Sequence, residues 1–168
     1  LCDAKIIASL YEASAAGVQI DLVVRGICCL KTGIPGVSEN IHVRSIVGDF
    51  LEHSRIFYFH NNGHEEVYMG SADWMPRNLD KRVEILFPVE DETLKAEVIH
   101  ILTIQLQDTL KAHIMQPDGT YRKQDLRGKK KLCAQDYFRQ EAMKNASQRK
   151  KEQNARRTFE PMTAESEE

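Results

Sequence analysis

The chain has 168 residues, 42% of them hydrophobic, and a formal net charge of −2 at pH 7. This length and composition allow one good hydrophobic core, so we expect one domain and an appendage. No run of about 18 or more apolar residues occurs, which excludes a membrane-spanning helix of ordinary length. The first residues, Leu1–Lys5, are neither an initiator methionine nor a signal peptide, and indicate a cut through a longer polypeptide.

The chain begins with a predicted helix and two strands. Residues 3–16 carry apolar side chains at helical spacing, with Asp3 as a candidate N-cap and Gly17 as the stop. Two strands are then expected, over residues 18–25 and 41–47, separated by a loop rich in Gly and Pro.

Two further strands are expected to form a hairpin. Arg55–Phe59 and Val67–Met69 are rich in β-branched and aromatic residues, and Asn61-Asn62-Gly63 supplies the turn between them. If these runs pair, His53 and Gly70-Ser71 lie at the same end of the hairpin. A single phosphate is then within reach of both.

A strand over residues 82–88, a helix from 91 to about 112 and a turn at Pro117-Asp118-Gly119 complete the predicted elements. Helices alternate with strands along the chain, which is typical of an α/β layer. We therefore predict an α/β fold with a mixed β-sheet flanked by helices.

The C-terminal part differs in charge from the rest. Residues 1–126 hold 12 Lys and Arg against 18 Asp and Glu, whereas residues 127–157 hold 11 against three. The last eleven residues carry four Glu and no base. We expect a domain over 1–126 and a basic then acidic tail over 127–168, helical or partly disordered, either solvated without specific function or lying along nucleic acid or another bound phosphate polymer.

The segment from Leu51 to Glu84 carries residues suited to phosphate chemistry. Arginine donates parallel hydrogen bonds to phosphate oxygens, histidine transfers protons or acts as a nucleophile near neutral pH, and a Gly-Ser turn offers backbone N–H donors. Each residue alone has an ordinary structural explanation, and their joint spacing favours a phosphate site. The residues concerned are His53, Arg55, Ser71, Arg77, Asn78 and Arg82.

Arg25 follows an apolar run, Ile20–Val24, that predicts a buried parallel strand. Ligands of open α/β sheets gather at the carboxyl ends of such strands, so a charge there is either functional or paired. The structural alternative is a salt bridge to Asp49, Glu52 or Glu84.

His53-x-Arg55, followed by Gly70-Ser71-x-Asp73 and then Glu84, resembles a variant half-site of the phospholipase D superfamily. In that superfamily a His-x-Lys pair precedes a Gly-Ser-x-Asn turn and a Glu. Here Arg stands in place of Lys and Asp in place of Asn, which fits a generic phosphodiesterase poorly and a narrower relative well.

Three longer strings carry that narrower resemblance: Ile20–Leu30, Phe50–Arg55 and Gly70–Glu84. Together they resemble the last domain of the polyphosphate kinase family, with a phospholipase D-like fold, over residues 1 to about 125. Three motifs in the right order make a chance match improbable.

This resemblance implies a reversible transfer of the γ-phosphate of ATP, with Mg²⁺, through a phosphohistidine to polyphosphate. The phosphohistidine and the Mg²⁺ ligands are expected in preceding domains that the chain lacks, so no metal ligand is assigned here. His53 is the implied catalytic residue, and Arg25, His53 and Arg82 are the implied ATP and phosphate contacts. Supporting roles are assigned to Arg55, Ser71, Asp73, Arg77, Asn78 and Glu84.

The implied partners are ATP or ADP, inorganic polyphosphate, the remaining domains of the same enzyme and further copies in a homo-oligomer. Nucleic acid is not expected. The implied location is the cytoplasm, with membrane association only through a polyphosphate kinase complex. Because the site is built from two half-sites, residues 1–168 alone are predicted to be inactive.

Two other classes of function remain open at this stage. One is a phosphodiesterase or nuclease of the phospholipase D superfamily, which the basic tail favours. The other is a noncatalytic module that binds polyanions or drives oligomerisation.

Overall fold

The computed structural model describes residues 1–156, and side chains are described through Gln153. The chain divides into two compact units, residues 1–134 and the residues from Gln135 onward. Each unit is described by itself. The acidic end of the predicted tail, residues 158–168, lies outside the described residues.

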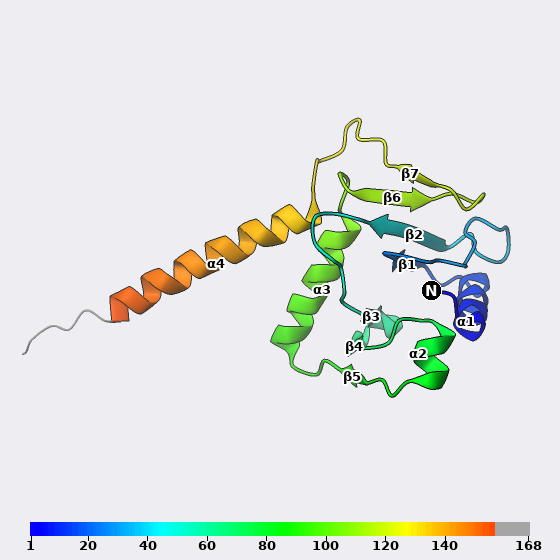
Figure 1. Ribbon diagram of the computed structural model, residues 1–168, viewed down its shortest axis with the longest axis horizontal. Coiled ribbons are helices and arrows are strands. Elements are labelled where there is room, and N and C mark those ends of the chain that lie inside the picture. The colour runs from blue at the N-terminus through cyan, green and yellow to red at the C-terminus, as the bar shows by residue number, and fades with distance from the viewer. Residues whose placement is uncertain (157–168) are drawn as a thin grey trace, which may run out of the picture. The chain divides into compact units, whose positions relative to one another are not determined.

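The first unit contains a four-stranded mixed sheet with strand order β1-β2-β6-β7 (Figure 1). β1 and β2 run parallel, with Ile20 opposite Ile41, and the other neighbours are antiparallel. The strands are β1 (Ile20–Val23), β2 (Ile41–Ile46), β6 (Ala112–Met115) and β7 (Tyr121–Lys123). The turn predicted at Pro117-Asp118-Gly119 is confirmed and joins β6 to β7.

A second, antiparallel sheet has the order β3-β4-β5, with β3 (Ile56–Phe59), β4 (Glu66–Gly70) and β5 (Leu86–Pro88). The sequence predicts one mixed sheet, and the structure has two. The predicted hairpin is confirmed, because Ile56 pairs with Met69 and Phe59 with Glu66. Asn61 and Asn62 take positive φ angles of 42° and 52° in the turn, a conformation that Asn tolerates better than most residues.

Helices flank both sheets. Asp3 caps α1 (Ala4–Ala15) by accepting a hydrogen bond from the Ile6 backbone N–H at 3.0 Å, and Gly17 follows the helix with φ +92°. α2 (Pro76–Lys81) begins with a proline, and α3 (Glu92–Leu106) is capped by Asp91. α3 contacts β1, β3 and β4, so it packs against strands of both sheets.

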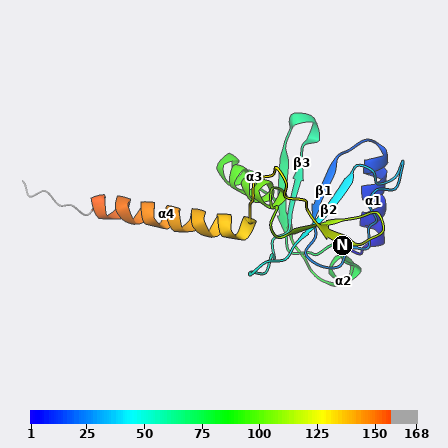
Figure 2. The same ribbon diagram turned by 90° about the horizontal axis from the view of Figure 1, so that it is seen from above.

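The main hydrophobic cluster contains Leu1, Leu30, Ile41, Val43 and Met115. Apolar side chains of α1 pack against this cluster, and α1 lies beside β1 and β2 (Figure 2). This packing fixes β1, and with it the loop that carries Arg25.

Three predicted elements are clearly shorter than expected. The strand predicted over residues 18–25 spans only Ile20–Val23. The helix predicted to about residue 112 ends at Leu106, because the buried Asp108 carboxylate accepts hydrogen bonds from the Lys111 and Ala112 N–H groups at 2.7 and 3.1 Å. Ala112 then enters β6. The strand predicted over residues 82–88 is confined to β5, since the Ile85 N–H donates to the Ser71 hydroxyl, a side-chain acceptor.

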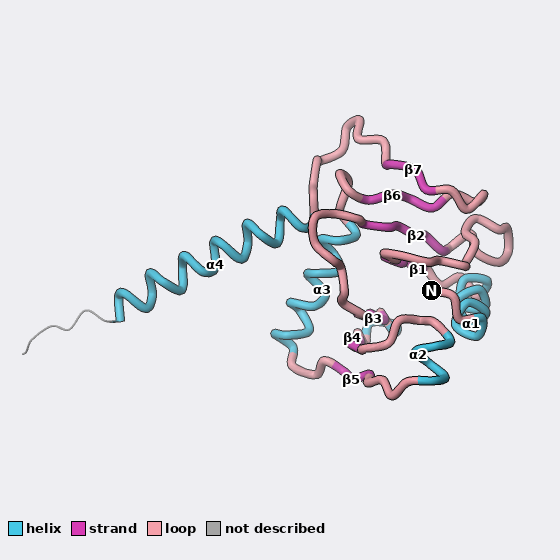
Figure 3. The backbone as a smooth tube through the Cα atoms, viewed as in Figure 1, coloured by secondary structure: helices cyan, strands magenta, loops and turns pink. Residues whose placement is uncertain are grey.

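Asp108 also accepts from the Ala134 N–H at 2.7 Å and thereby holds the first residue of α4 (Ala134–Arg156). α4 runs without interruption through the described part of the second unit (Figure 3). No helix within residues 1–156 is long and apolar enough to cross a membrane.

Candidate active site

Most of the predicted site residues lie on loops at strand ends, drawn pink in Figure 3. Arg25 follows β1, and His53 and Arg55 precede β3. Ser71 and Asp73 follow β4. Arg82 and Glu84 lie between α2 and β5, and Arg77 and Asn78 are on α2.

The hairpin brings two of these loops together. The Gly70 N–H donates to the Arg55 carbonyl at 3.1 Å, so the start of β3 lies beside the end of β4. A side chain at Gly70 would meet the Ile85 carbonyl oxygen at 3.1 Å and the Leu86 Cδ1 atom at 3.2 Å. Glycine is therefore required where β4 approaches the segment leading into β5.

Asp73 lies between two arginines. Its Oδ1 accepts from Arg55 Nε at 3.1 Å, and its Oδ2 lies 3.7 Å from Arg25 Nη2. The hydrogen bond from Arg55, followed by the charges of Arg55 and Arg25, lowers the pKa of Asp73 although partial burial opposes this. Arg25 and Asp73 remain about one-third exposed, at 35% and 33%, so solvent reaches this group.

Arg55 also holds His53. Its Nη1 lies 3.1 Å from His53 Nδ1 and donates to the His53 carbonyl at 3.0 Å. His53 is exposed, whereas the Arg55 side chain is 16% exposed. We call Arg25, His53, Arg55 and Asp73 the Asp73 group.

A second set of contacts centres on Glu84. Its Oε2 accepts from the Ser71 hydroxyl, and its Oε1 accepts from Asn78 Nδ2 at 2.8 Å and lies 3.8 Å from Arg82 Nε. These hydrogen bonds, Ser71 first and then Asn78, lower the pKa of Glu84, and the charges of Arg82 and Arg55 act in the same direction. We call Ser71, Asn78, Arg82 and Glu84 the Glu84 group.

The two groups are neighbours, because Ser71 and Asp73 are two residues apart and the charge of Arg55 acts on both carboxylates. Arg82 belongs to the Glu84 group, where its carboxylate partner is Glu84, and its side chain is 57% exposed. Arg77 lies exposed on α2. Arg25 does form a salt bridge, as its structural explanation predicted. The partner is Asp73, whereas the sequence predicted Asp49, Glu52 or Glu84.

Trp74, the residue after Asp73, packs against the main hydrophobic cluster. Trp74 stacks on Phe57 with ring centroids 5.1 Å apart, and its carbonyl accepts from the Cys2 and Asp3 N–H groups at 2.9 and 3.1 Å. The residue after Asp73 is therefore fixed both to β3 and to the start of α1. No sequence signal identified this contact.

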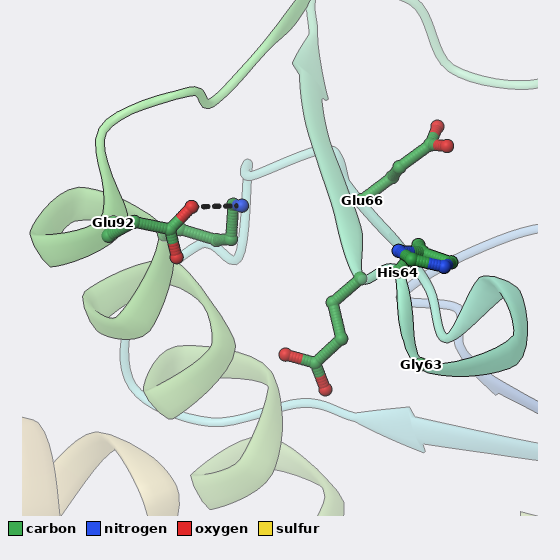
Figure 4. Close-up of a pocket in the computed structure, with 6 residues that line it drawn as sticks. Gly63, His64, Glu66 and Glu92 are labelled. Atoms are coloured by element: carbon green, nitrogen blue, oxygen red, sulfur yellow. Dashed lines mark hydrogen bonds and ion pairs between the residues drawn. The ribbon is translucent and has the colours of Figure 1, made fainter.

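A hollow of about 460 Å³ lies at the other end of the hairpin, near its turn (Figure 4). Its lining is Gly63, His64, Glu65, Glu66, Glu92 and Lys95. Lys95 is paired with Glu92 at 2.6 Å, which leaves an acidic surface unsuited to phosphate.

The carboxylates of both groups are poor candidates for Mg²⁺ ligands, because arginine or hydrogen-bond donors already occupy their oxygens. Within residues 1–153, no three or more His, Cys, Asp and Glu side chains are arranged to hold a metal ion. The arginine side chains of this site suit it to binding anionic oxygens.

Comparison with known proteins identifies the family. Residues 1–135 match the family model described as "Polyphosphate kinase C-terminal domain 2". The chain is 63% identical over 121 residues to a polyphosphate kinase of Synechocystis sp., covering 72% of the chain and 17% of that relative. It is 60% identical over 123 residues to the polyphosphate kinase of Pseudomonas aeruginosa, covering 73% and 18%.

A solved structure agrees. The chain superimposes on the crystal structure of polyphosphate kinase from Porphyromonas gingivalis with a TM-score of 0.82 and 47% identity, covering 88% of the chain and 23% of that structure. The chain thus spans about a fifth of the length of the relatives that it matches. It belongs to the polyphosphate kinase family, as the C-terminal domain of that enzyme family.

Proposed function

We propose that the chain is the C-terminal part of an enzyme that reversibly transfers the γ-phosphate of ATP to inorganic polyphosphate. The transfer passes through a phosphohistidine in a preceding domain, and this part supplies phosphate contacts and a second histidine. The observation that carries the proposal is the Asp73 group, in which two guanidinium groups and an imidazole gather at one solvent-accessible carboxylate.

Phosphoryl transfer depends mainly on positioning and on neutralising the charge of the transferred group. Arg25 and Arg82 are the proposed contacts to ATP and polyphosphate oxygens, since both guanidinium groups keep exposed surface. His53 is the proposed catalytic residue, and it is exposed and held by Arg55. Supporting roles are proposed for Arg55, Ser71, Asp73, Arg77, Asn78 and Glu84.

The proposed catalytic part is residues 1–126, with a phospholipase D-like fold, and residues 127–168 form its tail. The proposed substrates are ATP or ADP and polyphosphate, with Mg²⁺ held by ligands outside this chain. A cytoplasmic location and a homo-oligomer complete the proposal, and the chain alone is expected to be inactive.

An exposed apolar strip around β5 is a proposed contact surface for the remaining domains of the same enzyme. Val83 is 101% exposed, and Ile85, Leu86 and Phe87 are 63%, 64% and 45% exposed. Contiguous apolar side chains at a sheet edge are typical of surfaces that another protein part covers. The family members extend well beyond this chain, so such parts are available.

The test is polyphosphate synthesis from ATP by the full-length protein. His53→Ala and Arg25→Ala are each expected to reduce turnover by about 10² to 10³, as for loss of one well-placed donor in an active site. Arg122→Ala, which changes an exposed arginine on β7 outside the site, is the control and should retain activity.

Two results would count against this function. One is a full-length protein that neither makes polyphosphate from ATP nor makes ATP from polyphosphate and ADP. The other is a variant, His53→Ala or Arg25→Ala, that keeps more than about a tenth of the normal turnover, where a loss of 10² or more is expected. The first removes the activity itself, and the second removes only the residue assignment.

A further inference from the structure

The Arg55 guanidinium bridges three acceptors in the Asp73 group. It lies 3.1 Å from Asp73 Oδ1, 3.0 Å from the His53 carbonyl oxygen and 3.1 Å from His53 Nδ1. The same guanidinium thus holds both the backbone and the ring of His53. Its side chain is 16% exposed, so the surrounding protein restricts its movement.

The contact with the ring fixes the position of a proton. A guanidinium group stays charged and carries N–H donors but no acceptor. His53 Nδ1 must therefore accept the hydrogen bond with its lone pair. In the neutral ring the single proton then lies on Nε2, the nitrogen that faces away from Arg55.

We propose that Arg55 is a positioning residue that holds His53 as the neutral Nε2–H tautomer, and that His53 acts through Nε2–H as a hydrogen-bond donor to a phosphoryl oxygen. This inference rests on the proposed function, because it assigns the chemical role of His53 in that site. The role involves no transfer of the proton: the Nε2–H bond stays intact while the phosphoryl group moves.

Two other roles of a histidine are disfavoured by the same contact. A nucleophilic ring needs its lone pair on Nε2, which requires the proton on Nδ1, opposite the Arg55 donor. A charged imidazolium has N–H on both nitrogens and would point one of them at the guanidinium cation. A neutral imidazole that donates to a developing negative charge is an established device in other enzymes.

Asp73 anchors this arrangement. It accepts from Arg55 Nε through one oxygen and pairs with Arg25 through the other. Arg55 is thereby tied to β3 by its backbone, to the loop after β4 by Asp73 and to the ring of His53. Arg25 is held beside the same carboxylate, which places a cation and the Nε2–H donor in one group.

The first test reads the tautomer directly, by NMR of the protein labelled with ¹⁵N in histidine at about pH 8, where an ordinary imidazole is neutral. His53→Gln identifies the resonances of His53. We expect Nδ1 to be unprotonated and Nε2 protonated in the wild-type protein, and Arg55→Met to mix the two tautomers. Arg122→Met should leave the pattern unchanged.

A proton on Nδ1 in the wild-type protein would overturn the inference, and so would an unchanged His53 signal in a folded Arg55→Met variant. The wild-type measurement decides the question even if Arg55→Met fails to fold. It also needs no activity, so it stands apart from the test of the proposed function.

The second test uses polyphosphate synthesis by the full-length protein. Glutamine carries an N–H donor close to the position of Nε2 but accepts and releases no proton near neutral pH. We expect His53→Gln to keep at least about tenfold more turnover than His53→Ala, whose loss is about 10² to 10³. Equal loss in the two variants would show that His53 must exchange a proton or form a bond, and would overturn the donor role.

Discussion

The two carboxylates of the site have different kinds of partner. Asp73 lies between two cations, Arg25 in the loop after β1 and Arg55 just before β3. Glu84 accepts mainly from neutral groups, Ser71 and Asn78. Asp73 therefore holds two cations of the proposed phosphate site, whereas Glu84 links α2 to the loop after β4.

Among the changes that compare the two carboxylates, Asp73→Asn is expected to have the largest effect. The amide keeps the shape of the side chain but removes the negative charge shared by Arg25 and Arg55, so both guanidinium groups shift. Small misplacements in an active site cost about 10² in rate, and we expect a loss of that order in polyphosphate synthesis by the full-length protein.

The control for this prediction is Asp80→Asn, which changes an exposed aspartate on α2. It should leave turnover and melting temperature unchanged. The distinction between the two carboxylates breaks down if Asp73→Asn lowers the melting temperature strongly while the folded fraction turns over at the normal rate.

Glu84→Gln is expected to lower the stability of the protein more than its turnover. It weakens the hydrogen bonds from Ser71 and Asn78, and Asn78 is buried with its Oδ1 atom lacking a partner among the described residues. We expect the melting temperature to fall by roughly 2–4 °C and turnover to fall by less than in Asp73→Asn. Calorimetry and kinetics on the same preparation check this, and an unchanged melting temperature would contradict it.

The two carboxylates share a pH dependence. Both have a pKa below the ordinary value when folded, so the unfolded chain binds their protons more readily. The stability they contribute is present above the unfolded pKa values of about 3.9 and 4.3 and is lost as pH falls through the lower folded values. Melting temperature measured from pH 6 downward should fall less steeply below about pH 4 in Asp73→Asn and Glu84→Gln than in the wild-type protein.

The sequence predicted the local elements of this site well. Short-range patterns identified the Asp3 cap, the Asn61–Gly63 turn and the hairpin that joins Arg55 to Gly70, because each depends on neighbouring residues. The family resemblance is confirmed by the match over residues 1–135.

What the sequence missed depends on contacts between distant residues. The apolar pattern of the predicted helix continued to Leu110. The buried Asp108 carboxylate, however, accepts hydrogen bonds from the N–H groups that would have extended the helix. Asp73 was predicted as a supporting residue, yet its pairing with Arg25 joins segments from different sheets and has no local signal. The division into two sheets likewise has no local signal, and α3 contacts strands of both sheets.

Deletion of residues 136–168 is expected to have the smallest effect. The basic side chains of α4 that are described, such as Arg139, Lys144 and Lys150, are exposed, which is typical of a solvated helix. We therefore expect the turnover of the full-length protein to change by less than about twofold, as for surface changes away from a site. Polyphosphate affinity measured at several salt concentrations is the sharper readout. A weaker affinity with a shallower salt dependence would mean that α4 binds the polyanion and releases its counterions, which would contradict a solvated role.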